Sequence, residues 1–104
     1  DTERILAFRA LSIARGEVKS LNNFNENEYA KIGTAINRNP ESMILEYNYL
    51  RKSSNYLFNS FSNAENKSKG RVADNTISVN ALGFIIIGHC LHHVNICQKL
   101  YEIN

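Results

Sequence analysis

Apolar residues recur every three or four positions in three stretches of the chain, and each stretch predicts an amphipathic helix. The three stretches cover residues 1–15, 40–61 and 78–102. Gly16 is expected to end the first helix. Asn39-Pro40-Glu41 is typical of a helix start, because Asn39 can cap the second helix, Pro40 suits its first turn and Glu41 is favourable at the positive end of its dipole. Ser78 is expected to cap the third helix.

Steps of four and three alternate in the second and third stretches, which is the spacing of a seam in a helical bundle. The second seam consists of Met43, Tyr47, Leu50, Ser54, Leu57 and Phe61. The third consists of Leu82, Ile86, His89, His93, Ile96, Leu100 and Ile103. The first stretch has a wider apolar face, formed by Ile5, Leu6, Phe8, Leu11, Ile13 and Ala14.

The segments between these helices are polar. Residues 17–38 predict a long connection with a turn or two of helix near 28–36, and residues 62–75 predict a loop. No segment alternates with period two between turn signals, so no strands are expected. The pattern therefore predicts an all-α fold, and a length of 104 residues predicts one domain over 1–104.

Composition and charge argue against nucleic-acid binding and against a membrane-spanning protein. The net charge is +2 and the basic residues are scattered along the chain among acids, which argues against a nucleic-acid partner. The longest apolar runs, such as residues 84–87, are far too short to span a membrane, and no signal-peptide pattern is seen. Cys90 and Cys97 lie about 10 Å apart on one helix, too far for a disulfide, and unpaired cysteines favour a cytoplasmic location.

The candidate chemistry lies in the third helix, where all three histidines fall within five positions. His89 and His93 are one helical turn apart and occupy successive seam positions where Ile or Leu would be expected. A divalent metal would satisfy both imidazoles in a bundle interior. The alternative is a pair of core histidines hydrogen-bonded to Tyr, Ser or backbone groups, and the spacing alone leaves both readings open.

Further ligands are less well defined. His92 is rotated away from the seam and is a weaker candidate, which could instead bond a neighbouring side chain or lie at a subunit contact. Cys97 could extend the row as a soft ligand, although a small buried hydrophobic role fits it better. A remaining ligand could come from Asp1, Glu3, water or a second chain, while both carboxylates could equally compensate a helix dipole.

Aromatic residues are concentrated on the second helix, where they predict core and interface positions. They are Tyr47, Tyr49, Tyr56, Phe58 and Phe61.

Residues 78–96 resemble the closing helix of the DinB-like superfamily. Members carry a stretch like Ser-Val-Arg-Ala-Leu-Gly-Tyr-Ile-x-x-Gly-His-x-x-His-His-x-Asn-Ile, and this chain reads Ser-Val-Asn-Ala-Leu-Gly-Phe-Ile-Ile-Ile-Gly-His-Cys-Leu-His-His-Val-Asn-Ile. Residues 1–5 with 14–17 are similar to the family's second helix, and residues 29–51 are similar to its third-helix region. Asn80 and Phe84 stand where the family usually has Arg and Tyr, which could alter the polar rim of the site.

The resemblance implies an up-down four-helix bundle, of which this chain would hold about three long helices and lack the first. It also implies a zinc or nickel ion held by three histidines, two of them matching His89 and His93. The third family ligand would stand upstream of Asp1 and is absent from the chain. A site with two histidines binds metal more weakly than one with three, so its occupancy is left open.

Family members include metal-dependent hydrolases and thiol S-transferases, often homodimeric. The resemblance therefore implies a metal-dependent enzyme acting on a small-molecule or thiol substrate. The alternative is a non-catalytic helical module that self-associates through an uncovered apolar groove.

Overall fold

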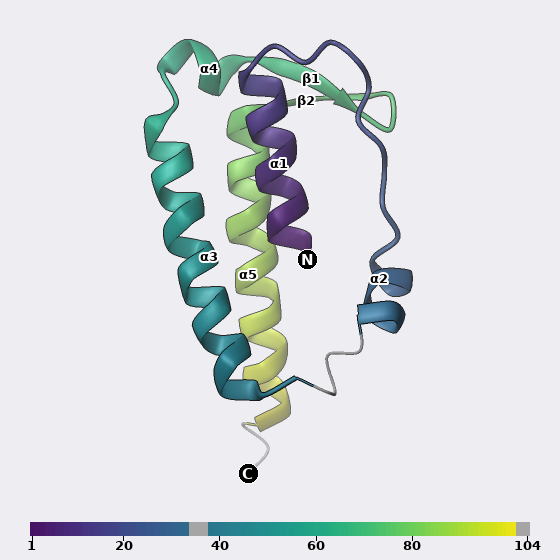
Figure 1. Cartoon of the computed structure of the whole chain (residues 1–104), viewed down its shortest axis with the longest axis vertical. Coiled ribbons are helices and arrows are strands. Elements are labelled where there is room, and N and C mark those ends of the chain that lie inside the picture. The colour runs from purple at the N-terminus through teal and green to yellow at the C-terminus, as the bar shows by residue number, and fades with distance from the viewer. Residues whose placement is uncertain (34–37, 102–104) are drawn as a thin grey trace.

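The structure is a computed structural model that describes residues 1–33 and 38–101, with side chains described as far as residue 91. The described elements are α1 (Thr2–Ala14), α2 (Glu26–Gly33), α3 (Pro40–Ser60), α4 (Asn63–Lys67), β1 (Lys69–Val72), β2 (Asn75–Ser78) and α5 (Val79–Tyr101). Figure 1 shows α1 and α3 running in the same direction and α5 returning alongside them, with the β1–β2 hairpin across one end. The chain is mostly helical, as predicted, and its three long helices lie at the predicted positions.

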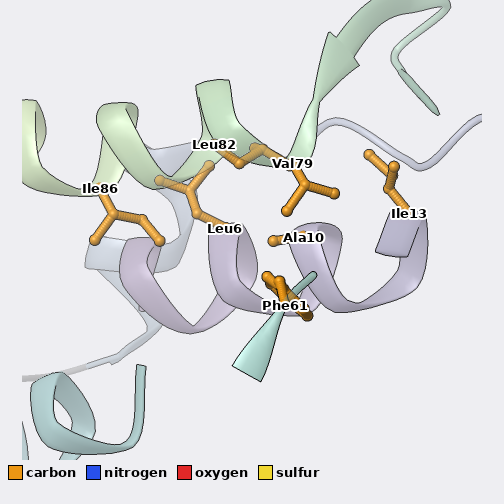
Figure 2. Close-up of a cluster of buried hydrophobic side chains, with 7 residues drawn as sticks. All are labelled: Leu6, Ala10, Ile13, Phe61, Val79, Leu82 and Ile86. Atoms are coloured by element: carbon orange, nitrogen blue, oxygen red, sulfur yellow. The ribbon is translucent and has the colours of Figure 1, made fainter. Parts of the chain in front are cut away.

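The core lies where α1 packs against the first half of α5 (Figure 2). Ala10 is fully buried, and its small side chain allows the two helices to approach closely. Phe61, just after the end of α3, is buried in the same cluster. The buried apolar residues are Leu6, Ala10, Ile13, Phe61, Val79, Leu82 and Ile86.

The predicted helix starts of α3 and α5 are confirmed. The side chain of Asn39 accepts a hydrogen bond from the backbone N–H of Glu41 at 2.9 Å, with Pro40 in the first turn. Ser78 Oγ accepts one from the N–H of Ala81 at 3.0 Å. At the end of α1, Gly16 adopts a φ of 91°, a left-handed conformation that ends the helix.

The expectation of no strands was wrong. β1 and β2 pair in antiparallel register, from Lys69 opposite Ser78 to Val72 opposite Asn75. Ala73 and Asp74 form the two-residue turn, with φ of 48° and 66°. Positive φ at both turn positions matches the twist of the paired strands, although neither position holds the glycine that is usual there. Strands of four residues are too short to show alternation, and the turn sequence carries no Asn-Gly or Asp-Gly signal.

The loop predicted over 62–75 was also incomplete, because it contains α4 as well as β1. Ser62 and Glu65 form a capping box: Ser62 Oγ accepts from the Glu65 N–H at 3.1 Å, and Glu65 Oε1 accepts from the Ser62 N–H at 3.0 Å. This Ser-x-x-Glu spacing was visible in the sequence.

The long connection after α1 is attached to the hairpin and then forms a short helix. Leu21 donates to the Arg71 carbonyl and accepts from the Ala73 N–H, each at 2.8 Å. The helix α2 begins at Glu26, slightly before the predicted turn near 28–36, of which residues 34–36 lie outside the described part of the chain.

One expectation about apolar positions was wrong, and another is confirmed only in part. Phe8 is 61% exposed, so the buried face of α1 is narrower than the sequence pattern suggested. Tyr49 and Tyr56 are 66% and 80% exposed and do not belong to the core, whereas Phe58 packs against it and Phe61 is buried within it. Among the described residues, no helix is both long and apolar enough to cross a membrane.

Candidate functional site

His89 lies on the wall of a recess of about 520 Å³, which forms where four parts of the chain meet. These are the first turn of α1, the α2 region, the N-terminal half of α3 and the middle of α5. The lining residues are Asp1, Thr2, Arg4, Phe24, Glu26, Asn27, Tyr29, Ala30, Gly33, Arg38, Met43, Glu46, Tyr47, Leu50 and His89. Its described lining therefore combines charged groups, aromatic rings and the imidazole of His89.

The histidine row retains its predicted spacing along the backbone. The helix α5 is continuous from Val79 to Tyr101, so His89 and His93 are one turn apart on the same face. His89 is half-buried. The side chains of His92, His93 and Cys97 lie outside the described residues, so the predicted ligand set is described at His89 alone.

A chain of polar contacts links α1, α3 and α5 beside this recess. The Glu3 carboxylate accepts two hydrogen bonds from Arg51, at 2.6 and 3.0 Å, and one from Ser54 at 3.0 Å. Arg51 also donates to the Tyr47 hydroxyl at 3.1 Å, and that hydroxyl lies 2.8 Å from Cys90 Sγ. Because Arg51 donates to the phenol oxygen, the phenol hydrogen is available to the sulfur of Cys90.

This environment changes the acidity of Tyr47. Burial, followed by the hydrogen bond with Cys90, raises the pKa of the Tyr47 phenol to about 12. The nearby Arg51 charge opposes that rise but does not cancel it. Tyr47 is therefore a neutral hydrogen-bonding group near neutral pH.

Glu46 joins two arginines at the edge of the recess. Its Oε1 pairs with Arg38 at 2.6 Å and its Oε2 pairs with Arg4 at 3.1 Å. The hydrogen bond and charge of Arg38, with a smaller contribution from Arg4, lower the pKa of the Glu46 carboxyl. Glu46 is thus a carboxylate at neutral pH, shared by two guanidinium groups.

The two carboxylates suggested as further metal ligands have different environments. Glu3 lies in the first turn of α1, but its carboxylate also accepts hydrogen bonds from Arg51 and Ser54. Its side chain is only 10% exposed. Asp1 lines the recess, and it begins α1 through its carbonyl rather than its side chain.

The fit to a metal is partial. The imidazole of His89 suits zinc or nickel. Within the described residues, however, no three His, Cys, Asp or Glu side chains come together as a ligand group. A metal held by this helix therefore depends on His93, whose position one turn from His89 is given by the helix backbone.

Nothing in the sequence pattern indicated that Arg4, Arg38, Arg51 and Glu46 belong to the site, because the pattern does not show how one helix is placed against another. One signal was available at Ser54, a polar residue on the predicted seam of α3. Ser54 is 5% exposed and bonds Glu3, so a hydroxyl at that seam position indicated a buried polar partner.

Comparison of the chain with protein-family models, with curated proteins and with solved structures finds no match.

Proposed function

We propose that this chain is a DinB-like helical protein that binds a divalent metal, zinc or nickel, through His89 and His93 and acts as a hydrolase or thiol S-transferase. The observation that carries the proposal is the position of His89 on the wall of the recess, with His93 one turn along the same continuous helix. The likeness of residues 78–96 to the family motif supports it. The recess provides the space for a small-molecule or thiol substrate.

A metal bound there would supply Lewis-acid chemistry, which lowers the pKa of a coordinated water or thiol. The surrounding residues have other roles. The Glu3–Arg51 pair fixes α1 against α3, and Arg51 orients the Tyr47 hydroxyl beside α5. The polar chain thereby holds the helix segment that carries His89.

The proposal includes the location of the protein in the cell. Cys90 is a free cysteine, and free cysteines are typical of reducing compartments, so we place the protein in the cytoplasm as part of the proposal.

Isothermal titration of chelator-stripped protein with zinc and then nickel tests the metal site. The wild type should bind one equivalent, and His89→Ala or His93→Ala should weaken binding by tenfold or more, since each removes one of two ligands. His92→Ala is the matched control from the same helix and should bind as the wild type does. Unchanged affinity in both the His89→Ala and His93→Ala proteins would contradict the proposed site.

A second candidate function is self-association without catalysis. It is favoured by a hollow of about 240 Å³ between α3 and α5, whose lining includes Phe58, Gly83, Phe84 and Ile87. Phe84 is 69% exposed and Ile87 is 52% exposed, so this groove presents apolar surface to solvent. A homodimer that covers the groove would bury that surface.

Sedimentation over a concentration series tests this second candidate. Phe84→Glu should shift the protein toward monomer, whereas Tyr49→Glu, at an exposed aromatic outside the groove, should not. A wild type that remains monomeric at every concentration would exclude self-association.

A further inference from the structure

We propose that the recess beside His89 binds a small molecule that has an apolar body and a single negatively charged group. This inference deepens the proposed function, on which it rests for the role of His89, by naming the class of substrate. It is drawn from the charges, the rings and the size of the recess.

The negatively charged group would be bound at the edge formed by Arg4, Glu46 and Arg38. These three side chains carry one net positive charge, and Glu46 uses a different oxygen for each arginine. The contacts with Glu46 occupy one nitrogen of each guanidinium, which has five N–H donors. The side chains of Arg4 and Arg38 are 56% and 43% exposed, so their remaining donors can reach a carboxylate or sulfonate.

The apolar body would lie against the rings and aliphatic side chains of the same recess. Phe24 and Tyr29 meet edge to face, with ring centroids 5.2 Å apart, and Met43 and Leu50 of α3 also line the space. The volume of about 520 Å³ falls in the range of small-molecule pockets. An aromatic acid of two fused rings is therefore a suitable probe.

The other charges of the recess limit the ligand to a single negative group. Asp1 and Glu26 also line it, so among the described residues the lining holds three carboxylates, including Glu46, and two guanidinium groups. A polyanion such as a nucleoside triphosphate would be repelled by the carboxylates that are not paired with arginine. A monoanion needs only the Arg4–Glu46–Arg38 edge.

The test is the binding of 2-naphthoate to metal-free protein in a chelator at low ionic strength, measured by calorimetry. The neutral 2-naphthalenemethanol and adenosine triphosphate serve as contrasting ligands. Arg4→Gln and Arg38→Gln should each weaken naphthoate binding by roughly two- to fivefold, the scale of an exposed ion pair. Glu46→Gln should tighten it by a similar factor, because it frees both guanidinium groups.

Arg15→Gln is the matched control, since Arg15 forms a comparable exposed pair with Glu65 at 2.7 Å, away from the recess. It should leave naphthoate binding unchanged. Equal binding of the acid and the alcohol, stronger binding of adenosine triphosphate, or a Glu46→Gln protein that binds more weakly than the wild type would overturn the inference. Because no metal is present, these results are independent of the zinc titration, and either proposal can fail while the other stands.

Discussion

The Glu3 carboxylate of α1 and the Arg51 guanidinium of α3 are joined by two hydrogen bonds, at 2.6 and 3.0 Å. Their side chains are 10% and 26% exposed, which makes them better shielded than the pairs formed by Arg4, Arg15 and Arg38. Few other contacts connect α1 to α3, because α1 packs mainly against α5. The pair therefore has an important part in positioning α3 beside the rest of the molecule.

Arg51→Ala should lower the free energy of unfolding by about 1–3 kcal/mol, because it leaves the shielded Glu3 carboxylate without its main partner. Urea unfolding measures the change. Arg15→Ala removes an exposed pair and should cost less than about 1 kcal/mol. Equal losses in the two variants would show that the Glu3–Arg51 pair contributes no more than a surface pair.

Gly70→Ala should destabilise the protein by about 1–3 kcal/mol, the usual cost of overpacking a core. A Cβ added at Gly70 would lie 2.5 Å from Ile13 Cγ1, and Ile13 is itself only 3% exposed and cannot move aside. Gly88→Ala is the control, since a Cβ there meets nothing within 4 Å and alanine favours a helix. Thermal unfolding should show a lower midpoint for Gly70→Ala alone, and an unchanged midpoint would mean that β1 does not lie tightly over α1.

The Tyr47 phenol should ionise at a higher pH than a tyrosine of the unfolded chain. Subtracting the tyrosinate absorbance titration of Tyr47→Phe from that of the wild type should isolate a midpoint near pH 12. A pKa raised by folding gives stability that is complete below the unfolded value, about 10, and is lost as the pH rises toward 12. The wild type should therefore lose stability relative to Tyr47→Phe across that window, and a midpoint near 10 would contradict the burial and the Cys90 contact.

The positions of the three long helices could be predicted from the sequence, because these helices carry their own periodicity and caps. Asn39 and Ser78 marked two helix starts correctly through local chemistry. The hairpin could not be predicted, since its pairing depends on contacts between short segments. Ala73 also adopts a left-handed conformation that alanine rarely takes.

The candidate site was predictable only in part. The spacing of His89 and His93 along one helix is a local property and could be read directly. The contacts of Glu3 with Arg51 and of Glu46 with Arg4 join residues that are far apart in the chain, and they depend on how the helices are placed against one another. That placement follows from the packing of the whole core, which periodicity does not specify.

The central claim is that His89 and His93 together hold a divalent metal. Its most direct test is the metal content of protein purified without added metal and without a polyhistidine tag, measured by plasma mass spectrometry for the wild type and for His93→Ala. The account predicts zinc or nickel near one equivalent in the wild type and a large loss in His93→Ala, with His92→Ala unchanged. Equal metal content in the wild type and His93→Ala would contradict it.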